Sequence, residues 1–320
     1  MHKSSGRWQL GLSLALVTTI LWGLLPIALD ALLKKMDPWT ITFYRFFGAA
    51  LVIGLYLFAK NKLPQRSLLN KRLVILFSIA TITLCANYVF FIMGLNLAKP
   101  ATTQVMIQLA PMILLFGGLV IFKETFSRLQ WIGFIIFFIG LLLFFNHRIT
   151  QLFTARGDYS TGVFYIFIAA ITWAIYALIQ KQLLQYFSGL AIIFIILTMG
   201  SLLFFPVAEI TQIKQLDAFH LFLLFFASMN TAIAYGAFAE ALQHWEASRV
   251  SAVLSLTPII TVTLLHVLSN HYPQWFQFEA LSQLTILGML VVVLGSMLTA
   301  LGRAKAKSKL TLEQVPLIAE

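Results

Sequence analysis

Long apolar segments separated by short polar ones recur along nearly the whole chain of 320 residues. A helix needs about 20 residues to cross the hydrocarbon core of a bilayer. Ten segments of that kind can be placed, at residues 9–33, 38–59, 72–95, 99–122, 128–146, 160–182, 188–208, 218–242, 245–269 and 280–302. The runs are too long and too uniformly apolar for barrel strands. The pattern therefore predicts an all-α integral membrane protein with ten transmembrane helices.

The composition excludes several classes of protein. Hydrophobic residues make up 60% of the chain and charged residues 10%, whereas about 25% of the residues in a soluble domain are charged. A soluble enzyme, a disordered chain and a nucleic-acid-binding protein are therefore excluded. The first apolar run is too long for a signal peptide, which predicts a retained span. The single cysteine, Cys85, lies in an apolar segment and is expected to be a small buried hydrophobe.

The net charge of +11 is unevenly distributed between the two sides of the membrane. If the N-terminus is cytoplasmic, 15 of the 22 Lys and Arg residues lie in inner segments, six lie in outer segments, and Arg45 lies within a span. Because positive residues collect on the cytoplasmic side, both termini are predicted to be cytoplasmic. The basic tail that follows the last span is interpreted first as this topology signal and second as a site for anionic lipid.

Three signatures occur in the same order in the two halves of the chain. Spans one and six share a central tryptophan, spans four and nine a Leu-x-Pro, and spans five and ten two glycines seven residues apart. The matched residues are Trp22 and Trp173, Pro111 and Pro258, Gly133 with Gly140, and Gly288 with Gly295. Since each half has five spans, the second enters the membrane from the opposite side. Two inverted five-helix repeats around a central cavity are therefore predicted, as in many secondary transporters.

The predicted division of the chain follows from these repeats. It comprises a cytoplasmic N-terminus at 1–8, a first repeat at 9–146, an inter-repeat loop at 147–159, a second repeat at 160–302 and a basic cytoplasmic tail at 303–320. The repeated glycines are expected to let helices pack closely, because small residues allow helix backbones to approach.

Motifs of a known family stand in register in both halves. The first half has Trp22-Gly23 with Pro26, then Arg45, then the run from Ala98 through Pro111 to Lys123-Glu124. The second half has Trp173-Ala174 with Tyr176, then the run from Ala247 to Pro258, but Asn270-His271 replaces an expected glutamate. Over about residues 10–302 the chain resembles the EamA-type branch of the drug/metabolite transporter superfamily. The resemblance implies ten helices, a basket-like fold with a central cavity, and export of amino acids or other small metabolites.

Arg45 is the strongest candidate for a substrate-binding residue. A charged side chain inside a span is costly to insert into the membrane, so such residues are functional candidates. It lies about seven residues into the second span, about 10 Å along a helix that rises 1.5 Å per residue. Two interpretations stay open. Arg45 binds a substrate carboxylate, or it is structural and either snorkels outward or hydrogen-bonds carbonyls and pairs with Asp30 at the end of the first span.

Uncharged polar and aromatic residues at mid-depth extend this candidate site. Gln104 and Gln108 share one helix face, and Ser251 and Ser255 occupy the matching face in the other half. Hydrogen bonding between helices, worth about 0.6–2 kcal/mol each, is the alternative role. Together with Thr231, the residues expected to bind substrate or line the cavity are Trp22, Arg45, Asn87, Tyr88, Gln104, Gln108, Trp173, Tyr176, Asn230, Tyr235, Ser251 and Ser255.

Three prolines inside spans, Pro26, Pro111 and Pro258, are expected to kink helices and shape gates. Pro111 and Pro258 deprive the carbonyls of Ile107 and Leu254 of a helical partner. Bends around a cavity that leave backbone acceptors open would follow, with a packing kink as the alternative. No carboxylate lies at the centre of a span, and a proton relay usually needs one. A facilitator or exchanger is therefore favoured over a proton-coupled carrier.

The sequence favours transport over other functions. It has no nucleotide-binding loop, metal-ligand cluster or catalytic triad, so no cofactor, no metal and no enzymatic activity are predicted. A membrane-embedded lipid-modifying enzyme is the alternative class, and import or exchange of a nucleoside-like compound is the alternative within transport. A small-molecule substrate and membrane lipids are the expected partners, without nucleic acid. The expected location is the bacterial inner (plasma) membrane, the oligomeric state is undetermined, and a monomer is compatible with the chain.

Overall fold

The computed structural model describes residues 7–64, 70–122, 126–148, 157–278 and 280–302. Within these ranges the chain forms helices and no strand. Seven helical segments of the described chain, with Ser248–His271 counted as one, are long and apolar enough to cross a membrane, which confirms an all-helical membrane protein. The N-terminal residues 1–6, Lys123-Glu124, the loop residues 149–156 and the basic tail 303–320 lie outside the described residues.

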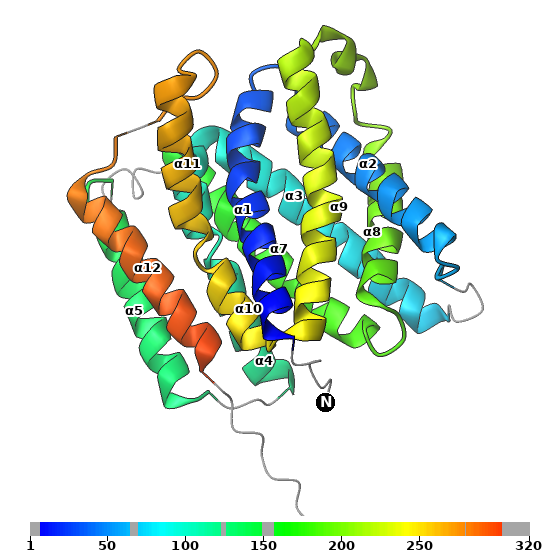
Figure 1. The fold of residues 1–320 in the computed structure, drawn as a ribbon, viewed down its shortest axis with the longest axis horizontal. Helices are drawn as coiled ribbons and strands as arrows, with labels where there is room; N and C mark the ends of the chain where they lie inside the picture. Colours follow the sequence, from blue (N-terminus) through cyan, green and yellow to red (C-terminus); the bar gives the residue numbers. More distant parts are fainter. Residues whose placement is uncertain (1–6, 65–69, 123–125, 149–156, 279, 303–320) are drawn as a thin grey trace, which may run out of the picture.

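The helices lie together in one bundle, and α1 and α9 run side by side through its middle in Figure 1. The first half of the chain forms α1 (Trp8–Leu32), α2 (Pro38–Ala59), α3 (Lys71–Met106), α4 (Leu109–Phe122) and α5 (Arg128–Phe144). The second half forms α7 (Asp158–Leu183), α8 (Gly189–Phe204), the 3-10 helix η2 (Ile210–Gln215), α9 (Ala218–His244), α10 (Ala247–Leu254), α11 (Thr257–His271) and α12 (Gln283–Leu301).

Polar residues cap the first turns of several helices, where four backbone N–H groups lack helical partners. Asp37 accepts hydrogen bonds from the N–H groups of Trp39 and Thr40 at the start of α2, at 2.8 and 3.1 Å. Asp217 accepts one from the N–H of His220 at the start of α9, at 3.0 Å, and contacts the His220 ring at 2.8 Å. Hydrogen bonds to the ionised carboxylate hold the pKa of Asp217 below its usual value.

Two of the predicted spans are not single helices. Span 99–122 begins inside α3 and continues as α4 after a break, and span 245–269 is divided between α10 and α11. A new helix begins within three residues before Pro111 and directly before Pro258. Proline has no N–H to donate but fits the first turn of a helix, where that donor is not needed. The expected kinks at these two prolines are therefore short interruptions of the helix, with right-handed helical φ and ψ still present at Ile107, Ser255 and Leu256.

The predicted loop between spans three and four is reduced to one non-helical residue within α3. Lys99 has φ 69° and ψ 162°, and helical structure resumes at Pro100. Proline disfavours a helical conformation in the residue before it. A positive φ with this ψ is a region that glycine alone adopts readily, and it costs another residue about 1–3 kcal/mol. The backbone at Lys99 is strained.

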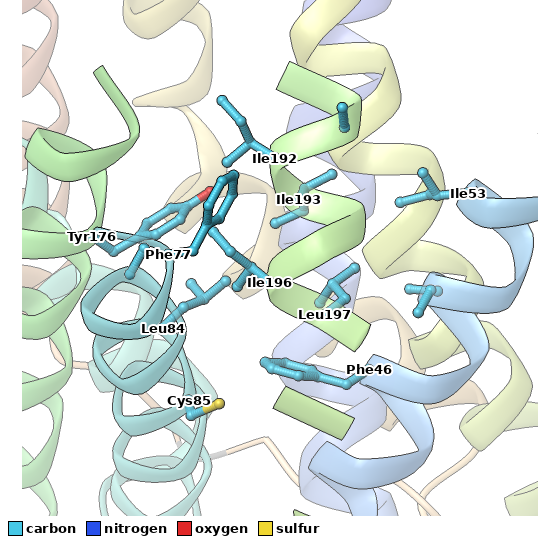
Figure 2. Packing of buried hydrophobic residues seen from close by; sticks show 14 of the residues in the cluster. Phe46, Ile53, Phe77, Leu84, Cys85, Tyr176, Ile192, Ile193, Ile196 and Leu197 are labelled. Atoms are coloured by element: carbon cyan, nitrogen blue, oxygen red, sulfur yellow. The ribbon is translucent and has the colours of Figure 1, made fainter. Parts of the chain in front are cut away.

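A large apolar cluster fills the space between α2, α3, α7 and α8, as Figure 2 shows. Phe46 of α2, Phe77 and Leu84 of α3, and Ile193 of α8 are buried there. Tyr176 of α7 points into the same cluster beside Phe77. Close packing supplies many small dispersion contacts, which hold helices together in lipid, where burial from water contributes little.

Glycines bring α5 and α12 into backbone contact. A Cβ atom added at Gly288 would lie 2.2 Å from the backbone nitrogen of Phe144, and one added at Gly140 would lie 2.5 Å from that of Val292. Residue numbers rise along α5 as they fall along α12, so the two helices run antiparallel. The close packing expected from the repeated glycines is confirmed.

Candidate functional site

A cavity of about 490 Å³ lies between helices from both halves of the chain. Its volume falls within the range of about 300–1,000 Å³ that small-molecule sites occupy. The lining runs from Trp22 and Arg45, in the middle of their helices, to Gln130, Ser248 and Gly302. These last three residues lie at the end of the bundle where α1 begins (Figure 1). The cavity therefore extends from mid-depth toward the N-terminal end of α1.

Most of the predicted site residues lie around this one cavity. Tyr176 does not line it, because its side chain faces the apolar cluster between α3 and α8. Of the three prolines, Pro111 lines the cavity, whereas Pro26 and Pro258 do not. Whether the lining residues bind a substrate stays a prediction. The predicted binding residues in the lining are Trp22, Arg45, Asn87, Tyr88, Gln104, Gln108, Trp173, Asn230, Tyr235, Ser251 and Ser255.

Arg45 lies in the cavity wall without the predicted acidic partner. Its Nη2 donates to Oγ1 of Thr231 at 3.3 Å, and its guanidinium lies over the ring of Tyr88, 4.5 Å from the ring centre. Arg45 is not paired with Asp30, the partner named for its alternative, structural role. Asp30 pairs instead with Lys99 at 3.4 Å, because the turn at Lys99 lies beside the end of α1 whereas Arg45 lies deeper in the bundle.

The electrostatics of the cavity are dominated by this arginine. Arg45 is 3% exposed, and its Nε is buried without a hydrogen-bond partner in the described part of the chain. No other described residue in the lining carries a formal charge at neutral pH. A buried charge is costly unless it is paired. The cavity therefore contains a buried cation to which the described residues supply no anionic partner.

Aromatic side chains form much of the remaining wall. Trp22 packs edge-on against Tyr235, with ring centres 5.7 Å apart, and lies 5.8 Å from the ring of Phe238. Phe91 and Trp173 also line the cavity. Such rings offer large apolar contact areas, so this wall can enclose the apolar body of a small molecule.

Three consecutive backbone carbonyls of α1 accept hydrogen bonds from three other helices. Pro26 lacks an N–H, which leaves the carbonyl four residues earlier without a helical donor. Side chains from α3, α9 and α11 converge on this turn, so Pro26 shapes the site without lining it. The pairs are Asn230 Nδ2 with Leu21 O at 2.6 Å, Gln104 Nε2 with Trp22 O at 2.7 Å, and Thr261 Oγ1 with Gly23 O at 2.8 Å.

The two helix breaks contact each other across the halves of the chain. Gln108, between α3 and α4, donates from Nε2 to the carbonyl oxygen of Ser255, between α10 and α11, at 3.1 Å. Both residues line the cavity. The positions matched by the sequence repeat therefore meet at one point in its wall.

The carbonyls that were expected to be open at the breaks have protein partners. The carbonyl of Ile107 accepts from the N–H of Ala110 at 2.9 Å, and that of Leu254 accepts from the hydroxyl of Thr257. A tighter turn and a side chain replace the lost helical bonds, as is usual at helix ends. These two carbonyls are therefore not free acceptors for a substrate.

Polar residues on α5, α10 and α12 also line the cavity and were not among the expected site residues. Ser296 and Thr299 of α12 are three residues apart, a spacing that puts both on one helix face. The Oγ atom of Ser296 is buried without a hydrogen-bond partner among the described residues. Two polar residues on one face of an otherwise apolar span are the signal that would have identified them.

The chain matches known transporter sequences along most of its length. A family model described as "EamA-like transporter family" matches residues 9–146 and again residues 160–300. The chain belongs to the EamA-like transporter family. It is therefore a transporter and not an enzyme.

Bacterial relatives of this EamA-family member are similar over most of their length. The Escherichia coli (strain K12) protein "Uncharacterized inner membrane transporter YhbE" is 38% identical over 294 residues, which is 92% of each chain. An "Uncharacterized transporter" of Haemophilus influenzae is 35% identical over 293 residues, covering 92% of this chain and 95% of the relative. These relatives and the apolar helices place the EamA-family member in the bacterial inner membrane.

More distant comparisons bear on function and fold separately. A Salmonella typhimurium protein named "Probable amino-acid metabolite efflux pump" is 24% identical over 302 residues, covering 90% of this chain and 94% of the relative. A solved crystal structure superposes with a TM-score of 0.63 at 14% identity, covering 90% of this chain and 96% of that one. At that identity the structural likeness shows that this EamA-family member shares a fold with the crystallised protein.

Proposed function

We propose that this transporter exports amino acids or related small metabolites by alternating access between two inverted five-helix repeats. The observation that carries the proposal is the cavity itself, which both halves of one chain line and in which Arg45 lacks an acidic partner. The name of the distant Salmonella relative supports the substrate class. Because one chain supplies both walls, a monomer is the proposed functional unit.

Ten spans with cytoplasmic termini are part of the proposal. α3 is long enough to hold span three and the start of span four, and α10 with α11 together make span nine. The two matches of the family model support the division into repeats at 9–146 and 160–302, joined by 147–159 and flanked by 1–8 and 303–320. The inward bias of Lys and Arg supports the orientation.

In this orientation the cavity extends from mid-depth toward the cytoplasm, and packed residues close the bundle on the outer side. The outer closure consists of the Asp30–Lys99 ion pair and a buried apolar cluster that contains Leu29, Leu32 and Phe276. Rocking of the repeats would separate these contacts and close the cytoplasmic side. Bound substrate would then be released outside.

Loss of the outer ion pair is expected to favour the outward-open state. Asp30→Asn or Lys99→Gln should raise labelling of a reporter cysteine, Leu25→Cys in a Cys85→Ser background, by an impermeant external thiol reagent. The expected increase is up to about fivefold, because an exposed ion pair contributes about 0.2–1 kcal/mol. The double variant should add nothing beyond either single one. Unchanged labelling in both single variants would show that the pair does not hold the closed state.

Flux measurements test the transport proposal directly. Proteoliposomes loaded with a mixture of metabolites should show counterflow of at least one labelled component, and Gln108→Ala should lower that flux because it removes the contact between the helix breaks. Supplying the substrate on the inside or on the outside of the proteoliposomes decides between export and import, including import of a nucleoside-like compound. Chemical conversion of lipid without flux would favour the membrane-enzyme alternative.

A pH gradient alone is not expected to drive uphill accumulation. Asp30, Glu240 and Glu246 lie near helix ends, and the described lining contains no carboxylic acid or histidine. A proton-coupled carrier usually has such a group within the membrane. Accumulation of substrate in proteoliposomes with only a pH difference imposed, above the level in protein-free liposomes, would overturn this expectation.

A further inference from the structure

We propose that the cavity selects organic monoanions, meaning molecules with one carboxylate or similar planar anion, no ammonium group, and an uncharged, largely apolar body. The inference rests on the proposed function, since it specifies the substrate class of the same cavity. Within amino acids and related metabolites, it assigns preference to acids that lack the free amino group.

The geometry of Arg45 fits a planar anion. A guanidinium presents five N–H donors in a rigid fork, which matches a carboxylate through two parallel hydrogen bonds. One bond of this fork goes to Thr231, and the Nε–H has no partner among the described residues. The contact with the ring of Tyr88 holds the plane of the group in place. The fork is therefore oriented and only partly used, and a ligand carboxylate would reach the buried Nε–H after a local shift of the Arg45 side chain.

The charge balance of the cavity separates anions from zwitterions. Arg45 supplies one positive charge, and a monoanion brings the site to neutrality. A zwitterion adds an ammonium group that must also leave water, and the described lining offers it no carboxylate. A buried cation without an acid is penalised. For two ligands with the same skeleton, the monoanion should therefore bind more tightly.

Aromatic faces are the remaining attraction for an ammonium group, because a cation is drawn to the face of a tryptophan or tyrosine ring. In this cavity Trp22 and Tyr235 pack edge to face with each other, so each shields part of the other. Trp22 also lies against Phe238. These rings are better placed to hold an apolar body than to replace an acidic group, so they favour an aromatic or aliphatic acid.

Binding of a matched series to the detergent-solubilised full-length protein tests the inference. The three probes are L-3-phenyllactate, L-phenylalanine and phenethylamine, which at pH 7 are a monoanion, a zwitterion and a cation on closely similar skeletons. Titration calorimetry should give L-3-phenyllactate at least about tenfold tighter binding than L-phenylalanine, or about 1.4 kcal/mol. Phenethylamine should bind most weakly.

Two arginine variants link this preference to the cavity. Arg45→Gln should bring L-3-phenyllactate and L-phenylalanine to within about twofold of each other. Arg249→Gln removes a charge from an exposed arginine that pairs with Glu246 at 3.3 Å and lies outside the lining, and it should keep the wild-type preference. The wild-type comparison stands by itself if Arg45→Gln does not fold.

Several results would overturn the inference. They are no binding of L-3-phenyllactate, binding of L-phenylalanine as tight as that of L-3-phenyllactate, or an unchanged preference in folded Arg45→Gln. Counterflow of the same probes in proteoliposomes, corrected for protein-free liposomes, separates this failure from that of transport. A tenfold anion preference in binding without any counterflow would support the site chemistry and overturn the proposed function. Counterflow that prefers L-phenylalanine over L-3-phenyllactate would support the proposed function and overturn the anion preference.

Discussion

Gly288→Val is expected to prevent α5 and α12 from packing and to remove most folded protein. A Cβ atom at this position would lie 2.2 Å from a backbone nitrogen, that of Phe144, and no side-chain rotation can relieve that overlap. The helices would have to move apart along their whole contact. Overpacking of a core costs about 1–3 kcal/mol when side chains can adjust, so a larger loss is expected here. Thermal unfolding in detergent, read by size-exclusion chromatography, measures it.

A glycine substitution at an uncrowded position provides the control. Gly236 lies in α9, and a Cβ atom added there meets nothing within 4 Å. Gly236→Ala should leave the unfolding temperature unchanged or raise it slightly, since alanine restricts the unfolded chain. Equal stability of Gly288→Val and Gly236→Ala would show that the contact between α5 and α12 is not required for folding.

Arg45→Met is expected to reduce transport about 10- to 100-fold while leaving the unfolding temperature equal or higher. Hydrogen bonds to a charged group contribute about 1.5–3 kcal/mol, which is the expected loss of substrate binding. Methionine keeps much of the apolar stem, and replacing a buried charge by an apolar group of similar volume is often stabilising. Counterflow in proteoliposomes and thermal unfolding, measured on the same preparation, test both parts.

The two readouts separate the two roles left open for Arg45. Loss of a structural arginine would lower stability and leave the flux per folded molecule unchanged, whereas loss of a substrate-binding arginine lowers the flux per folded molecule and leaves stability unchanged. Arg45→Lys keeps the charge but not the planar fork, so it should retain an intermediate flux. A lower unfolding temperature in Arg45→Met, with flux per folded molecule unchanged, would assign Arg45 to the structural role.

The sequence predicted helix positions well because apolar length is a local property. Except for α3, which continues past the predicted span end at 95 to Met106, the described helices begin and end close to the predicted spans, and Pro111 and Pro258 mark the two places where a span is divided. The sequence predicted a loop between spans three and four, but it could not show that one strained residue, Lys99, would take the place of that loop. A residue before a proline can belong to a loop, or it can be a single strained position inside a helix. Which of the two forms depends on whether packing against neighbouring helices holds the strained conformation in place.

The partners of individual side chains were less predictable, because they depend on how helices are rotated against each other. Asp30 pairs with Lys99 rather than Arg45, although all three are distant in the sequence and the sequence alone favours neither pair. Tyr176 faces an apolar cluster although its repeat motif suggested the cavity. Ser296 lines the cavity from a helix that the sequence marked only for packing.

The cluster of carbonyls on α1 has a consequence for mutational scanning. Its acceptors at Leu21, Trp22 and Gly23 are main-chain oxygens, which no side-chain substitution at those positions removes. A residue-by-residue scan of α1 would report steric effects there and overlook the polar junction. Only the donors on the other helices would reveal it, as three distant sites whose defects resemble one another: Asn230, Gln104 and Thr261.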